Sequence, residues 1–100
     1  MRDLTFTAGA LDDSISAHCW YENKREGLGA EFDAALEAVL RRIRRSPETG
    51  KPIEPPFRRV TLRRFPYEVF YEFDPQRVLV VLVFHTAQNP AIALARLQGH

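Results

Sequence analysis

Four arginines in a short strand-like segment are the side chains of this sequence best suited to chemistry. Arg59 and Arg63 alternate with apolar residues and should project from one face of a strand, whereas Arg58 and Arg64 have the opposite parity near its ends. A guanidinium group can pair with a phosphate or a carboxylate through two hydrogen bonds, and it can stack on bases. The segment therefore predicts a surface that grips RNA or holds an acidic segment of a partner protein.

The glutamates and the histidine that follow these arginines leave other roles open. The arginines could pair with Glu68 and Glu72 on the neighbouring strand, which would make them structural. His85 ends the longest strand-like run, where an imidazole could act as a general acid or base near neutral pH. The same histidine could instead hydrogen-bond a turn.

Two pairs of neighbouring residues stand out earlier in the chain. Trp20 and Tyr21 would join a helix to the sheet, and whatever part of them stays exposed could bind a partner. Asp12 and Asp13 look like a carboxylate pair, but adjacent residues of a helix point apart. We interpret them as charges in the first turns of a helix, where they interact favourably with the helix dipole.

Several classes of site and of localisation are not indicated by this sequence. It has no phosphate-binding glycine loop, nucleophile elbow or paired-histidine metal motif. Cys19 is the single cysteine, so an internal disulfide is excluded, and no set of cysteines and histidines has zinc spacing. We expect no cofactor and no metal. There is no apolar leader and no membrane-spanning run, so we expect a cytoplasmic protein.

Charge is distributed unevenly along a chain of 100 residues, which we expect to form a single domain, 1–100. The net charge is only +1. Residues 41–64 nevertheless carry nine basic and two acidic side chains, whereas residues 1–40 carry three basic and eight acidic ones. A basic middle on a nearly neutral chain indicates a local anionic partner.

The stretch from Phe57 to His85 contains three runs rich in β-branched and aromatic residues. Turns at Pro66 and Pro75 separate them, which favours an antiparallel meander. The run that begins at Arg77 is apolar on both faces, so it should lie inside the sheet.

Helical patterns precede this meander. A first helix should run from Ala8 to about Lys24 and a second from about Ala30 to Arg45, with Gly27 in a left-handed conformation between them. The apolar faces are Leu11, Ile15 and Cys19 in the first helix, and Phe32, Leu36, Val39, Leu40 and Ile43 in the second.

The remaining segments complete an α+β fold. We expect an N-terminal strand from Asp3 to Thr7, a loop over residues 46–56, and a short C-terminal helix that Asn89 caps and Pro90 begins. The antiparallel helical hairpin should cover the face of the three-stranded antiparallel meander that bears Val60 and Leu62. Arg59 and Arg63 would then stay accessible on the other face.

An ordered set of short motifs carries a family resemblance over nearly the whole chain. The motifs are Trp20-Tyr21-Glu22, Gly27-Leu28-Gly29 with Phe32, Pro47, Arg63-Arg64-Phe65-Pro66-Tyr67 with Phe70-Tyr71, and finally His85 and Pro90. In this order they resemble the RelE/ParE toxin superfamily of bacterial type II toxin–antitoxin modules, and within it the ParE-like branch. The resemblance implies the fold described above and a cognate ParD-like antitoxin whose extended segment lies across the toxin.

The resemblance also implies a target, either DNA gyrase or mRNA in the ribosomal A site. Ala87 and Gln88 stand where relatives commonly carry basic residues, which removes charge that RNA cleavage would need. We therefore expect a toxin that inhibits gyrase by binding and is not an enzyme. The residues expected to contact the target or the antitoxin are Trp20, Tyr21, Arg58, Arg59, Arg63, Arg64 and Arg96. The alternatives are a ribosome-dependent mRNA endonuclease that uses Arg59, Arg63, Arg64 and His85, and an inactive antitoxin-binding relative.

Overall fold

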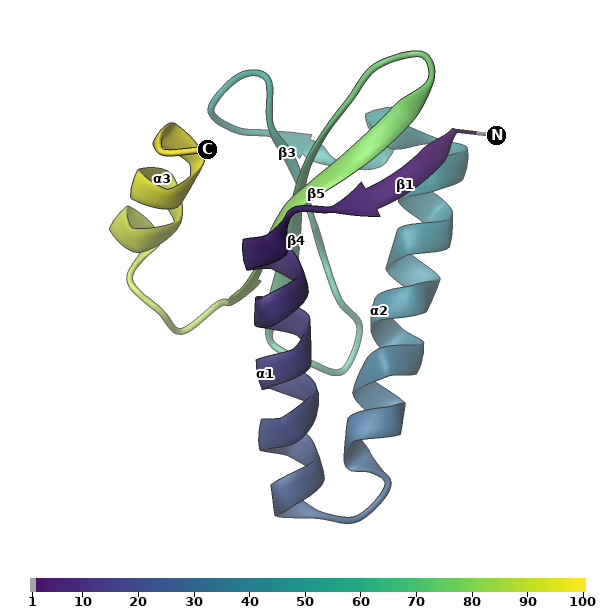
Figure 1. The fold of residues 1–100 in the computed structure, drawn as a ribbon, viewed down its shortest axis with the longest axis vertical. Coiled ribbons are helices and arrows are strands. Elements are labelled where there is room, and N and C mark those ends of the chain that lie inside the picture. Colours follow the sequence, from purple (N-terminus) through teal and green to yellow (C-terminus); the bar gives the residue numbers. More distant parts are fainter. Residues whose placement is uncertain (1) are drawn as a thin grey trace.

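Five strands form one mixed sheet in the computed structural model, which describes residues 2–100 (Figure 1). The strands are β1 (Asp3–Phe6), β2 (Lys51–Pro52), β3 (Arg58–Thr61), β4 (Tyr67–Phe73) and β5 (Arg77–His85). The helices are α1 (Ala8–Lys24), α2 (Leu28–Arg45) and α3 (Pro90–Gln98), with a 3₁₀ turn, η1 (Pro47–Thr49), after α2. The strand order is β1-β5-β4-β3-β2, and only β1 pairs in parallel.

The predicted α+β fold is confirmed, with one addition to the sheet. The meander β3-β4-β5 is antiparallel, and the N-terminal strand β1 pairs with β5, which places β5 inside the sheet as expected. The segment predicted as a loop over residues 46–56 contains η1 and the two-residue strand β2. Lys51 and Pro52 pair with β3 at the sheet edge, where a proline that lacks an N–H is tolerated. A strand this short leaves no alternation in the sequence from which it could be predicted.

The helical hairpin covers the predicted face of the sheet. Val60, Leu62 and Val69 are buried against α2, whose side chains Phe32 and Ile43 are fully buried. This helix begins at Leu28, two residues before the predicted start, because Gly27 caps it with a φ of 87°. The positive φ confirms the predicted left-handed glycine.

The predicted apolar face of α1 is wrong. Leu11 and Ile15 are 49% and 52% exposed, and Cys19 is also exposed. The helix instead buries Ala10, Ala17 and Tyr21. The small alanines allow close approach to the sheet, and the Tyr21 ring stacks on Phe32 with 5.5 Å between centroids. A pattern of large apolar residues did not reveal this face because most of it is built from small ones.

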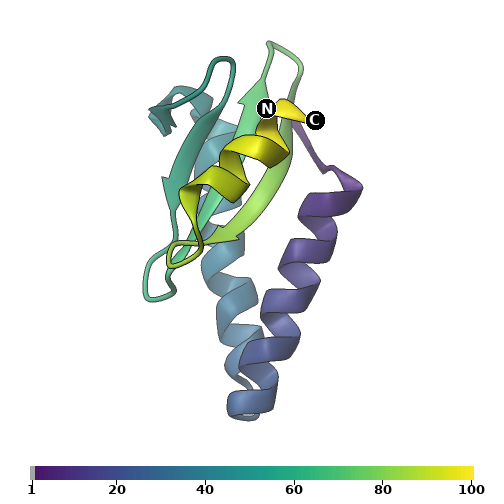
Figure 2. The same cartoon turned by 90° about the vertical axis from the view of Figure 1, so that its left-hand side faces the viewer.

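The second face of the sheet carries α3, which crosses it in Figure 2. Ala93 and Leu97 pack on the buried side chains of Phe70, Leu82 and Phe84. The predicted start of this helix is confirmed, because the Asn89 side chain accepts a hydrogen bond from the backbone N–H of Ala91. Within residues 2–100, no helix has the length and apolar character needed to cross a bilayer.

Candidate interaction surfaces

The predicted arginine surface is not formed, because its four members lie in different surroundings. Arg58 lies on β3 beside the edge strand β2, and its guanidinium donates to the carbonyl oxygens of Gly50 at 2.9 Å and Glu48 at 3.3 Å. Arg59 lies on the α3 side of the sheet, 3.3 Å from the carboxylate of Glu68. The structural alternative of cross-strand pairing therefore holds for Arg59.

Arg63 and Arg64 lie beyond the strand that was expected to display them. The strand β3 ends at Thr61, so its alternation of faces stops there and Arg63 does not share a surface with Arg59. Arg64 has a φ of 70°, a left-handed conformation that is uncommon for a residue with a side chain. Both arginines belong to the β3–β4 loop, beside α2.

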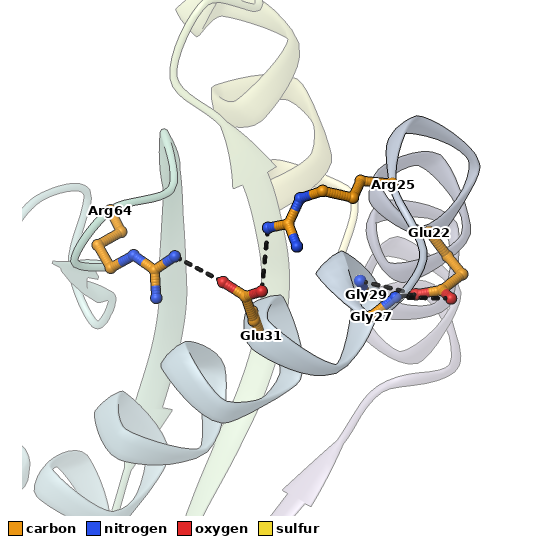
Figure 3. Close-up of polar contacts among 6 residues, drawn as sticks. All are labelled: Glu22, Arg25, Gly27, Gly29, Glu31 and Arg64. Carbon is orange, nitrogen blue, oxygen red and sulfur yellow. Dashed lines mark hydrogen bonds and ion pairs between the residues drawn. The ribbon is translucent and has the colours of Figure 1, made fainter.

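Glu31 fixes this loop to the hairpin (Figure 3). One carboxylate oxygen accepts from Arg64 at 2.7 Å and the other accepts from Arg25 at 3.0 Å. These hydrogen bonds hold the pKa of Glu31 below its usual value. Beside it, Glu22 accepts from the backbone N–H groups of Gly27 and Gly29, which likewise lowers its pKa (Figure 3). The two glutamates hold the α1–α2 junction and the loop in one arrangement.

A groove of about 590 Å³, here called the α2 groove, lies between α2 and the β3–β4 loop. It is lined by Glu31, Ala34, Ala35, Ala38, Val39, Arg42, Thr61, Arg63 and Arg64. Its floor is apolar and its rim carries three guanidinium groups. The sequence placed the arginines near one another but did not indicate the alanine floor, because those alanines lie outside the predicted apolar stripe of this helix.

A second concave surface of about 500 Å³, here called the α1–α3 cleft, lies between these two helices at the end of β5. It is lined by Asp13, Ser16, Ala17, Trp20, Tyr67, Val83, Phe84, His85, Ala87, Gln88 and Arg96. Trp20 is 54% exposed at its border, and the Lys24 ammonium lies 4.6 Å from the centre of its ring. Tyr21 is buried in the core, and its ring packs edge-on against that of Trp20 with 5.0 Å between centroids, so of this pair only Trp20 stays open to a partner.

Asp13 organises the α1–α3 cleft, a role that was missed by the sequence analysis. Strand β1 ends at Phe6, opposite Val80, so the edge of β5 beyond that point has no strand beside it. There one carboxylate oxygen of Asp13 accepts from the backbone N–H of Val83 at 3.0 Å. The same carboxylate accepts from both terminal nitrogens of Arg96 at 3.0 and 2.9 Å. The helix-start interpretation is therefore wrong, since the first turn of α1 contains no acidic residue.

His85 has a turn-stabilising contact in the same cleft. Its Nδ1 atom accepts a hydrogen bond from the backbone N–H of Ala87 at 3.0 Å. Its ring packs edge-on against Tyr67, with 5.0 Å between centroids. Burial raises the pKa of the Tyr67 hydroxyl. Among residues 2–100, no cluster of three histidine, cysteine or acidic side chains is arranged to hold a metal ion.

Comparisons with known proteins agree on one family. The family model described as the ParE toxin of the type II toxin-antitoxin system, parDE, matches residues 4–90 of this chain. Two relatives, both named Toxin ParE2 and from Mycobacterium tuberculosis strains CDC 1551 / Oshkosh and ATCC 25618 / H37Rv, are each 26% identical over 99 residues, or 98% of this chain and 94% of theirs. A solved structure, the chromosomal ParDE TA system from P. aeruginosa, has a TM-score of 0.75 at 17% identity and covers 85% of this chain and 96% of that chain.

Proposed function

Because this chain belongs to the family of ParE toxins of type II toxin–antitoxin systems, we propose that it arrests bacterial growth by binding DNA gyrase. A cognate antitoxin would neutralise it by binding the toxin. The family membership and the shared fold support the toxin role, and the arrangement of the candidate side chains favours binding over cleavage.

The choice of binding over cleavage rests on one observation, that the residues a nuclease mechanism would use lie in different parts of the structure. Cleavage of mRNA needs cations and a proton-transfer group that converge on one phosphate. Here Arg59 lies on the α3 side of the sheet, Arg63 and Arg64 lie beside α2, and His85 lies in the α1–α3 cleft. The Nδ1 atom of His85 is already occupied by a backbone N–H. These groups do not surround one reacting atom, whereas binding requires no such convergence.

We assign the target contact to the border of the α1–α3 cleft. Trp20 on α1 is 54% exposed and Ile92 on α3 is 50% exposed. Ile92 precedes Arg96 by four residues, so both lie on the same side of α3. Exposed tryptophans and arginines are enriched among the residues that dominate binding energy at protein interfaces. An aromatic and an aliphatic side chain beside a cleft that mixes polar and apolar lining residues suit a protein surface.

The test is a gyrase supercoiling assay with the purified chain. We expect inhibition by the natural protein and an inhibitory concentration about tenfold higher for Trp20→Ala, since removing an interface hot spot costs roughly 1–2 kcal/mol or more. Ile15→Ala is the matched control, because Ile15 is equally exposed on the same helix but outside the cleft. It should inhibit like the natural protein.

Two outcomes would overturn the proposal. The first is normal supercoiling in the presence of the folded chain at concentrations that arrest growth. The second is cutting of ribosome-bound mRNA by the chain, with most of the rate lost in His85→Ala. The second outcome would establish the nuclease alternative.

A further inference from the structure

We propose that the end of the molecule where α2 ends and β1 begins binds the phosphate backbone of duplex DNA. Three arginines, Arg2, Arg44 and Arg45, line a hollow of about 700 Å³ at this end, here called the basic hollow. It lies at the end of the helical hairpin opposite the α1–α2 turn (Figure 1). The inference goes beyond the proposed function, because it adds a nucleic-acid contact to the protein contact with the target.

The positive charge of the basic hollow is not balanced by neighbouring carboxylates. Among residues 2–100, Asp3 is the only acidic residue that lines it. In the same part of the chain, no carboxylate lies within ion-pairing distance of Arg2, Arg44 or Arg45. The three guanidinium groups therefore present positive charge that the phosphates of a bound partner can neutralise.

Backbone carbonyl groups hold two of these arginines in place. The Nε atom of Arg44 donates to the carbonyl oxygen of Arg2, and the Nε atom of Arg2 donates to the carbonyl oxygen of Asp74 at 2.8 Å. A hydrogen bond through Nε leaves the two terminal nitrogens of the guanidinium group to bind a phosphate. Side chains that are held before binding lose less conformational entropy when the partner arrives.

A fourth arginine extends the basic surface toward β3. The guanidinium carbons of Arg2 and Arg58 lie 5.6 and 6.0 Å from the centre of the same Phe73 ring. Arg44 and Arg45 lie in the last turn of α2, where cations interact favourably with the helix dipole. That dipole does not explain the other two, since Arg2 immediately precedes β1 and Arg58 begins β3. Arginines from three separate elements therefore meet at one end of the fold.

The surroundings of the basic hollow favour a phosphate backbone over a protein or a membrane. Among residues 2–100, no large aliphatic or aromatic side chain lines the hollow. Protein interfaces take most of their binding energy from such side chains, and peripheral membrane binding inserts them into the lipid. The exposed large apolar side chains described in this chain lie on α1 and α3 instead. Contact with phosphates requires none of them.

A duplex fits this surface better than a single strand. Single-stranded nucleic acids are bound largely through aromatic side chains on which unpaired bases stack. The Phe73 ring beside these arginines is half-buried and already has two guanidinium groups over it, so it is a poor platform for stacking. Duplex DNA is also the molecule on which the proposed target acts, so a toxin bound to gyrase would lie near this partner.

The basic hollow is separate from the other two concave surfaces. It has no lining residue in common with the α1–α3 cleft or with the α2 groove. Contact with DNA at the hollow is therefore compatible with a protein contact at the cleft. Substitutions in the hollow also leave the residues assigned to the target unchanged.

The test measures binding of the purified full chain to a short labelled DNA duplex by fluorescence anisotropy. We expect a dissociation constant of roughly 10⁻⁴–10⁻⁶ M near physiological salt, which is typical of contacts to the backbone alone. The logarithm of the association constant should fall with the logarithm of the salt concentration with a slope of about −3, because about three phosphates are neutralised. A second duplex of unrelated sequence should bind equally well, since backbone contacts do not read bases.

Arg45→Gln and Arg2→Gln should each weaken binding about tenfold at about 50 mM salt and bring the slope about 1 closer to zero, because each removes one phosphate contact. The matched control is Arg25→Gln, which removes the same charge from the α1–α2 turn at the opposite end of the hairpin (Figure 1). It should change the dissociation constant by less than about threefold. Thermal unfolding checks each variant, and exposed Arg45 tests the hollow even if Arg2→Gln is unstable.

The outcomes separate the basic hollow from the proposed target. The hollow assignment is overturned if the natural protein does not bind duplex DNA at low salt, or if Arg25→Gln weakens binding as much as Arg45→Gln does. Tighter binding of single-stranded RNA than of the duplex, lost in the same variants, would overturn the choice of duplex DNA. If the chain binds DNA with the expected variant pattern but does not inhibit gyrase, the hollow assignment stands and the gyrase proposal fails.

Discussion

Replacing Asp13 by alanine should destabilise the fold far more than replacing its neighbour Asp12. The carboxylate of Asp13 accepts hydrogen bonds from the backbone of Val83 and from both terminal nitrogens of Arg96. It therefore links α1 to strand β5 and to α3. The Asp12 side chain is exposed and makes no hydrogen bond or ion pair with another side chain or backbone group within residues 2–100.

The size of the effect can be worked out from these contacts. Val83 is 3% exposed, so its N–H would lose its partner in a buried position at a cost of about 1–3 kcal/mol. The ion pair is partly exposed, with 36% for Arg96 and 18% for Asp13, and contributes roughly 0.5–1 kcal/mol. We expect Asp13→Ala to lower the free energy of unfolding by about 2–3 kcal/mol. Asp12→Ala should change it by less than about 0.5 kcal/mol.

Two further variants show how much of the lost unfolding free energy comes from the hydrogen bond to Val83 and how much from the ion pair with Arg96. Asp13→Asn keeps an oxygen that can accept from Val83, and Arg96→Ala leaves the carboxylate on Val83 untouched, so each should lose only about 1 kcal/mol. Urea unfolding followed by circular dichroism measures all four variants. If Asp13→Ala loses no more than Asp12→Ala, the carboxylate does not hold the edge of β5. If it loses no more than Arg96→Ala, the ion pair alone accounts for it.

Three other predictions concern the junctions around the candidate surfaces. Tyr71→Phe should lose about 2–3 kcal/mol in urea unfolding, because its buried hydroxyl donates to a carbonyl of η1 and accepts from the N–H of Gly50. Glu31→Gln should be less stable than the natural protein at neutral pH. The folded-state pKa of the natural Glu31 carboxylate is lowered from 4.5, so the difference in stability should disappear as pH falls through that lowered pKa. A difference that stays constant with pH would refute this. Gly29→Ala should lower the melting temperature, since an added Cβ would lie 2.9 Å from the backbone oxygen of His18, and an unchanged melting temperature would refute the tight helix contact.

The local sequence pattern was sufficient to predict most helices and strands, and also the face of the sheet that the helical hairpin covers. The meander is predicted by runs of β-branched and aromatic residues that turns at Pro66 and Pro75 separate. Helix α2 is predicted by apolar residues that recur with a period of 3.6 on one side of the helix. The position of Val60 then decides which side of β3 the hairpin must cover. Each of these conclusions depends on residues a few positions apart.

The contacts that shape the candidate surfaces depend on the tertiary structure. The side of α1 that faces the core was decided by which small residues fit beside Tyr21, because exposed Leu11 and Ile15 form an equally regular stripe. The role of Asp13 depends on β1 being shorter than β5, which leaves a backbone N–H free 70 residues away. Periodicity records only whether a residue is apolar, whereas a long-range hydrogen bond requires the relative placement of whole elements. The sequence by itself therefore determined the elements and their order, and only packing decided which charged side chains meet.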